Sequence, residues 1–214
     1  KDRQLRIGPG NFFRDIRDLL KIRSFVILLV GMVFIHFSFG FIMPVLPLYL
    51  QQLAGAAEVV SVAGLVFAMR GLTSAVSSVL AGKWSNRLGS KRTMMFGLVG
   101  TSGILLAQGS APDVSTLAAA TVVGGLAFGV VRPLANVMIA DIVPVDDRGK
   151  AFGITTSASA FGFAIGPIVG AYLGATFGFP AAFYITSALF LAVTGWVWRS
   201  LDTSTPTERA KAGL

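Results

Sequence analysis

The chain has 214 residues, of which 54% are hydrophobic and 13% are charged, whereas a soluble domain carries about 25% charged residues. This composition argues against a water-soluble globule, and the 25 glycines fit membrane-spanning helices, in which glycine is frequent. The chain contains no cysteine, which excludes disulfides, cysteine zinc sites and thiol catalysis. Its net charge of +8 would suit nucleic-acid binding only if the basic residues formed a patch on a soluble surface. Their positions follow membrane topology instead, so no nucleic-acid partner is expected.

The chain opens with a basic segment, residues 1–23. Within it, Asn11 to Ile22 places apolar and charged residues on opposite faces of a helix, which predicts an amphipathic helix in the membrane interface. It would set the entry angle of the first span; a regulatory role is the alternative. The apolar face consists of Phe12, Phe13, Ile16, Leu19 and Leu20.

Six apolar stretches follow, each near the roughly 20 residues that a helix needs to cross the hydrocarbon core. They predict a transmembrane domain over residues 24–201 with short connections. Residues 202–214 are polar and predict a cytoplasmic tail or the start of a linker. The six stretches are Ser24 to Leu50, Val59 to Ala81, Thr93 to Gly109, Val114 to Ala140, Ala151 to Thr176 and Phe179 to Leu201.

The distribution of lysine and arginine predicts the orientation. All but two of the 18 basic residues lie before the first span, in the second and fourth connections, or at the end of the sixth span and beyond. Because positive charge is retained on the cytoplasmic side, both termini should be cytoplasmic in a multi-pass protein of the plasma membrane, the inner membrane in a bacterium. The two exceptions, Arg70 and Arg132, lie inside predicted spans.

The first and fourth spans share a pattern. Residues 39–44 and 128–133 both read Phe-Gly, three further residues, and Pro. Because these two spans run in opposite directions, the pattern predicts an inverted repeat of two three-helix units, which makes the fold all-α with six transmembrane helices. Chance recurrence of common residues is the alternative.

The second connection resembles the loop signature of the major facilitator superfamily, Gly-x-x-x-Asp-Arg-x-Gly followed by two basic residues, although Ser90 displaces the basic pair by one residue. Asn86 stands where the family has aspartate, so one charge of the cytoplasmic gate is missing. By the same resemblance, Arg87 and Asp141, which closes the fourth span, are expected to pair across the cytoplasmic face. The gate residues are Gly82, Asn86, Arg87, Gly89, Lys91, Arg92 and Asp141.

The fifth span resembles the helix signature of exporters in this superfamily, above all the drug:proton antiporters, although Ala171 replaces its final glycine. Small residues recur every fourth position from Ala158 to Gly174, so another helix can approach closely along that stripe. Helix packing alone is the competing interpretation. The resemblance covers about residues 24–201 and implies the amino-terminal six helices of a twelve-helix fold. The signature residues are Gly153, Gly162, Gly166, Pro167 and Gly170.

Three polar residues inside the spans are candidates for substrate binding or coupling: His36, Arg70 and Arg132. A lipid-facing arginine would cost at least about 2.5 kcal/mol, so both arginines should face protein or water. No acid lies inside the spans, so they pair with acids of a second half, with carbonyls and water, or with an anionic substrate. His36 could relay protons or be a hydrogen-bonded packing residue. The fourth-helix arginine that such antiporters use in proton coupling aligns with Gly125.

Together these features predict a secondary active transporter, a proton-coupled exporter of drugs or small amphiphiles that works by alternating access. An organic-anion or lipid-headgroup transporter is the alternative, favoured by the intramembrane arginines. An enzyme is not expected, because the catalytic motifs of intramembrane and hydrolytic enzymes are missing. A channel is not expected either, because the sequence contains no selectivity-filter signature. No cofactor or metal is expected. The expected partners are a small-molecule substrate, protons, membrane lipid, and either a carboxy-terminal six-helix half or a second copy.

Overall fold

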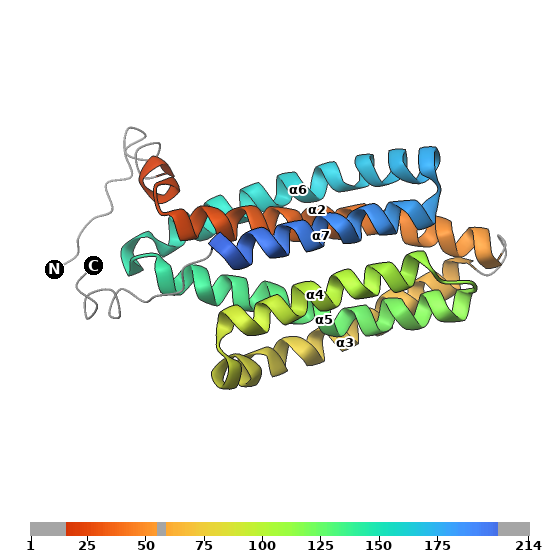
Figure 1. Ribbon diagram of the computed structural model, residues 1–214, viewed down its shortest axis with the longest axis horizontal. Coiled ribbons are helices and arrows are strands. Elements are labelled where there is room, and N and C mark those ends of the chain that lie inside the picture. The colour runs from red at the N-terminus through yellow and green to blue at the C-terminus, as the bar shows by residue number, and fades with distance from the viewer. Residues whose placement is uncertain (1–15, 55–58, 201–214) are drawn as a thin grey trace.

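The computed structural model describes residues 16–54 and 59–200. Six long helices form an all-α bundle in which they lie side by side along one axis (Figure 1). A helical turn over residues 16–20 precedes them, and the 3-10 helix η1, Val145–Asp147, precedes α6. The long helices are α2 (Arg23–Ala54), α3 (Val59–Leu88), α4 (Ser90–Gly109), α5 (Val114–Ile142), α6 (Arg148–Phe177) and α7 (Phe179–Ser200).

Each of the six predicted stretches forms one of these helices. Five helices are long and apolar enough to cross a membrane, namely α2, α3, α5, α6 and α7. The remaining helix, α4, is not among them, since Lys91 and Arg92 near its start and Gln108 near its end lower its hydropathy. Five of the six predicted stretches therefore form helices with the length and composition of membrane spans.

The predicted amphipathic helix over Asn11 to Ile22 lies only partly within the described residues, where residues 16–20 are helical. The predicted tail, residues 202–214, lies outside them.

Five helices extend beyond their predicted bounds, namely α2, α3, α4, α5 and α6, and two of these end at a glycine with a positive φ. The first, α3, continues through Lys83 and Arg87 to Leu88 because nothing in this stretch breaks a helix, and it ends at Gly89, whose φ is 85°. The other, α6, starts directly after η1 at Arg148 and ends at Gly178, whose φ is 83°. Both turns need glycine, since residues with a Cβ rarely adopt a positive φ.

The most extensive helix contacts join α2 to α6, α3 to α5, and α4 to both α5 and α7. Fully buried aromatic and aliphatic side chains fill the interior, among them Phe25, Phe41 and Phe183. The start of α2, the α3–α4 turn, the α5–α6 connection and the end of α7 all lie at one end of the bundle (Figure 1). This end carries the basic connections that the sequence predicts to be cytoplasmic.

Candidate functional site

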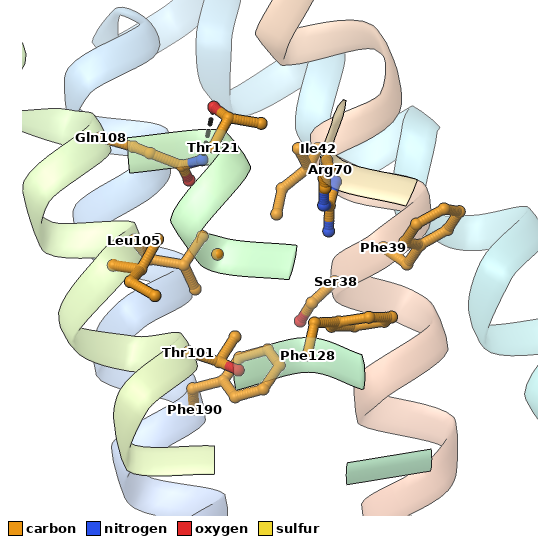
Figure 2. Close-up of a pocket in the computed structure, with 12 residues that line it drawn as sticks. Ser38, Phe39, Ile42, Arg70, Thr101, Leu105, Gln108, Thr121, Phe128 and Phe190 are labelled. Carbon is orange, nitrogen blue, oxygen red and sulfur yellow. Dashed lines mark hydrogen bonds between the residues drawn. The ribbon is translucent and has the colours of Figure 1, made fainter. Parts of the chain in front are cut away.

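Arg70 lies at the centre of the site. Its side chain projects from α3 into the bundle, and the residue is only 9% exposed. The guanidinium carbon lies 5.3 Å from the centroid of the Phe39 ring and 5.4 Å from that of Phe128. These rings come from α2 and α5 and stack on each other with centroids 5.6 Å apart, and Phe163 of α6 stacks on Phe39 at 6.0 Å. Figure 2 shows Arg70 between the two helices that carry these phenylalanines.

The arginine has aromatic rather than acidic neighbours. Within residues 16–54 and 59–200, its guanidinium makes no ion pair and no side-chain hydrogen bond. A cation over aromatic faces is stabilised by roughly 0.5–2 kcal/mol per ring. The sequence interpretation missed these aromatic partners, although the Phe-Gly pattern that marks the internal repeat had singled out both rings.

A small cavity of about 20 Å³, lined by both apolar and polar side chains, adjoins Arg70. This volume holds about one water molecule, so the site is closed to larger molecules in this conformation. The cavity is lined by Ser38, Phe39, Ile42, Arg70, Thr101, Ile104, Leu105, Gln108, Thr121, Gly124, Phe128 and Phe190 (Figure 2).

Gln108 of α4 supplies an unsatisfied acceptor to this cavity. Its Nε2 donates a hydrogen bond of 2.8 Å to Thr121 Oγ1, and that hydroxyl donates to the carbonyl of Leu117 at 2.7 Å. Gln108 Oε1 is buried without a hydrogen-bond partner among the described residues. An unsatisfied buried acceptor costs about 1–3 kcal/mol. A water or ligand that donates to Oε1 would therefore be favoured here.

The other two candidates for substrate binding or coupling, His36 and Arg132, do not line this cavity. His36 is half-buried on α2, and its Nδ1 lies 2.9 Å from the Met32 carbonyl oxygen, one turn earlier. Arg132 is exposed on α5 and close enough for its charge to act on His36. The structure therefore places Arg70 in a pocket that contains neither His36 nor Arg132.

The loop signature forms the tight α3–α4 turn. The Gly89 amide donates to the Ser85 carbonyl at 2.8 Å, and the Ser85 and Ser90 hydroxyls are hydrogen-bonded at 2.8 Å. Asn86 and Arg87 line a shallow surface hollow with Lys83 and Trp84. Within the described part of the chain, Arg87 and Asp141 make no ion pair in this conformation, so their pairing stays a prediction.

The glycines of the fifth-span signature divide into two groups. A Cβ on Gly162, Gly166 or Gly170 would run into the α2 backbone, for example at 2.7 Å from the Phe41 amide nitrogen for Gly166. A Cβ on Gly153 would meet nothing within 4 Å. The predicted close approach of another helix is therefore confirmed from Gly162 to Gly170, with α2 as the partner.

Gly125 aligns with the position at which the drug:proton antiporters that this chain resembles carry an arginine. A Cβ there would overlap Thr73 Oγ1 and the Arg70 carbonyl. In this conformation α5 is pressed against α3, with no room for a long side chain. The family arginine thus has no direct substitute on this face of α5, and the nearby buried cation is Arg70 on the opposing helix.

Comparisons with known proteins agree with this architecture. Residues 28–213 match the sequence profile of the Major Facilitator Superfamily. The chain is 35% identical over 156 residues to the multidrug resistance protein MdtG of Serratia proteamaculans, covering 72% of this chain and 38% of that protein. It is 31% identical over 172 residues to multidrug resistance protein 2 of Bacillus subtilis, covering 79% of this chain and 42% of that protein. The chain therefore spans less than half the length of these relatives.

Solved structures share the fold. The peptide transporter POT in complex with sulfate superimposes with a TM-score of 0.74 at 18% identity, over 89% of this chain and 42% of that one. The human organic anion transporter MFSD10 gives a TM-score of 0.66 at 22% identity, over 84% of this chain and 47% of that one. The chain is thus a multi-pass membrane protein that belongs to the Major Facilitator Superfamily of transporters and corresponds to roughly the amino-terminal half of such a transporter.

Proposed function

We propose that this chain forms the amino-terminal six helices of a proton-coupled exporter of drugs or small amphiphiles that works by alternating access. One observation carries the proposal: the glycines at the centre of the antiporter-like signature hold α6 against the α2 backbone. Such a contact without side chains lets two helices rock or slide as a cavity opens and closes. The similarity to multidrug resistance proteins supports export as the direction.

The packing supports the inverted repeat on which alternating access would rest. If α2, α3 and α4 correspond to α5, α6 and α7, then the α2–α6 contact corresponds to the α3–α5 contact, and both are extensive. A Cβ on Gly40 would overlap the carbonyl of Phe163, and one on Gly129 that of Ser74. Gly40 and Gly129 are separated by the same number of residues as Ser74 and Phe163, as a repeat requires.

In this proposal α4 also crosses the membrane, as the third of six spans, and both termini face the cytoplasm of a plasma membrane, the inner one in a bacterium. Residues 1–23 form a cytoplasmic amino-terminal segment, and residues 24–201 form the transmembrane domain. Residues 202–214 form a cytoplasmic tail or the start of a linker. A carboxy-terminal six-helix half or a second copy completes the cavity around small-molecule substrate and protons.

Transport into inside-out membrane vesicles that contain the complete chain tests the proposal. Acidifying the vesicle interior should drive uptake of a fluorescent lipophilic cation, and collapsing the proton gradient should stop it. Vesicles carrying Gly166→Leu, which would force α6 from α2, provide the inactive control. Uptake that is unaffected by the proton gradient would refute proton coupling.

His36 is the candidate for carrying the proton. In the coupling role, His36→Gln abolishes proton-driven uptake but spares exchange of substrate for substrate across the membrane, which needs no net proton movement. In the packing role, Gln replaces the hydrogen bond to the Met32 carbonyl and both activities persist.

A specific observation favours the alternative, an organic-anion or lipid-headgroup transporter: Arg70 is buried beside a small cavity and forms no ion pair among the described residues. An anionic substrate would supply the missing charge. The vesicles should then accumulate a fluorescent organic anion in preference to the lipophilic cation. Replacing Arg70 and Arg132 with Gln should raise the concentration needed for half-maximal uptake. Unchanged affinity in the double variant would eliminate this alternative.

A further inference from the structure

The outer side of the α4–α7 pair carries a second and much larger hollow, separate from the Arg70 cavity. This hollow, the α4–α7 groove, has a volume of about 1160 Å³. It is lined by Arg92, Met95, Phe96, Val99, Leu191, Ala192, Thr194, Gly195, Trp196, Trp198, Arg199 and Ser200. None of these residues takes part in the site described above, except that Arg92 closes the loop signature.

Positive charge is concentrated at one end of the α4–α7 groove. Arg92 lies in the first turn of α4 and Arg199 in the last turn of α7, and both are exposed. These helix ends lie at the same end of the bundle (Figure 1), so both arginines line the groove at that end. Within the described residues neither forms an ion pair. Lys91 adds a third cation 5.1 Å from the Trp198 ring centroid.

The rest of the groove is mainly apolar, and the kind of side chain that lines it changes along the helices. Trp196 and Trp198 are 43% and 49% exposed near the charged mouth, where indole rings typically mark the membrane interface. Farther along, Phe96, Val99 and Leu191 are 68%, 50% and 46% exposed. Arg92 and Val99 are about 10 Å apart along the helix axis. The groove thus passes from cations through indoles to aliphatic and aromatic surface, which is the order of phosphate, glycerol and acyl chain in a phospholipid.

We propose that the α4–α7 groove binds an anionic phospholipid. Arg92 and Arg199 donate hydrogen bonds to the headgroup phosphate, for which the guanidinium fork is well suited. The indole of Trp198 lies at the level of the glycerol, and an acyl chain follows Phe96, Val99 and Leu191. Basic pockets between transmembrane helices are known to hold anionic headgroups. This lipid is a bound component of the protein rather than the transported substrate.

Charge complementarity distinguishes this occupant from others. A second copy placed on the same face by two-fold symmetry would bring the arginine pair of one copy close to that of the other, and like charges repel. A zwitterionic phospholipid offers the same acyl chains without net negative charge.

Native mass spectrometry of the complete purified chain in detergent tests the proposal, with phosphatidylglycerol and phosphatidylcholine titrated separately. Phosphatidylglycerol should bind more tightly. Arg92→Gln combined with Arg199→Gln should weaken that binding roughly 10- to 30-fold, given about 1 kcal/mol per basic residue at a membrane surface. Gly195→Leu should also weaken it without changing charge, because Gly195 lines the groove and a Cβ there would meet nothing within 4 Å.

The matched control replaces Arg17 and Arg23 with Gln. Both are exposed near the start of α2 and outside the α4–α7 groove, so this variant removes the same charge and should bind phosphatidylglycerol as the parent does. An equal loss in the control, or equal affinity for the two lipids, would overturn the proposal. Competition by water-soluble glycerophosphoglycerol as strong as by the lipid would show a site for a free anion instead. Dimers lost on Gly195→Leu would assign the groove to a second copy.

Discussion

Arg70 illustrates, at the scale of single residues, a cation held by phenylalanine rings. Its position is costly, because placing an arginine at the centre of a spanning helix costs about 2.5–3.5 kcal/mol on insertion scales. The contacts with Phe39 and Phe128 recover only part of this, at roughly 1 kcal/mol per ring. Retaining such a charge is consistent with a role in binding rather than in stability.

We therefore expect Arg70→Met to raise the free energy of unfolding by about 1 kcal/mol and to lower transport at least tenfold. Thermal unfolding in detergent and vesicle uptake measure the two effects. Arg70→Lys, which keeps the charge, should recover part of the transport. A destabilised Arg70→Met with normal transport would instead identify a structural arginine.

Asp113, outside the membrane-spanning segments, caps the amino terminus of α5. Its carboxylate accepts hydrogen bonds from the Ser115 hydroxyl at 2.6 Å and from the Thr116 amide at 2.8 Å. The Ser115 hydroxyl, followed by the Thr116 amide, lowers the pKa of Asp113 below its ordinary value. Because the pKa is lower in the folded state, the cap stabilises the helix above the unfolded-state pKa of about 3.9 and is lost as pH falls below it.

The rate of amide hydrogen exchange over residues 114–117 is measured in the parent and in an Asp113→Asn variant at each pH. The ratio of the parent rate to the variant rate should increase in acid. Asparagine caps a helix about as well as aspartate but does not titrate in this range. If the parent and the asparagine variant keep the same ratio of exchange rates at every pH, Asp113 does not act as a titrating cap.

At the scale of helices, the α2–α6 contact depends on where each glycine lies around α6. Gly162, Gly166 and Gly170 are four residues apart and share a face, whereas Gly153 is nine residues before Gly162 and points about 180° away. This geometry explains why three signature glycines contact α2 and the fourth does not.

Gly166→Ala should therefore destabilise the protein by roughly 1–3 kcal/mol, since its Cβ would press on the α2 backbone and the helices must separate. Gly153→Ala is the matched control and should stabilise by about 0.5–1 kcal/mol, because alanine is the better helix former. Thermal unfolding of both variants measures the difference. Equal effects would mean that the close helix contact does not form in the membrane.

The helices were also the part of the fold that the sequence predicted best. Apolar runs bounded by charge located all six, because burial in lipid imposes a length on each span. The ends were less predictable: α3 continues to Leu88 because helix formation stops only where Gly89 adopts a positive φ. At the site, the sequence singled out Arg70, but its aromatic partners come from α2 and α5, and distant residues meet only through tertiary packing.

At the scale of the whole molecule, basic charge and topology agree. The end of the bundle that carries the start of α2, the α3–α4 turn and the end of α7 (Figure 1) also carries the basic connections, and the positive-inside rule predicts that such an end faces the cytoplasm. Because the chain has no cysteine, single cysteines introduced at Ser90 and Ser110 would report their sides directly. A membrane-impermeant thiol reagent added to intact cells should label the cysteine at 110 and not that at 90. Labelling of 90 alone would reverse the proposed orientation.

The polar contacts of α4 have a consequence for the order in which the chain is assembled during synthesis. Ser102 and Ser187 each donate to the other's carbonyl, at 2.9 and 2.8 Å, and Gln108 donates to Thr121. The partners of α4 thus belong to α5 and α7, which leave the ribosome later. A nascent α4, which is less apolar than its neighbours, would therefore stay close to the insertion machinery and would insert stably only after α7 has been synthesised. Chains truncated before Phe179 should therefore leave α4 extractable or misplaced, and chains that include α7 should secure it.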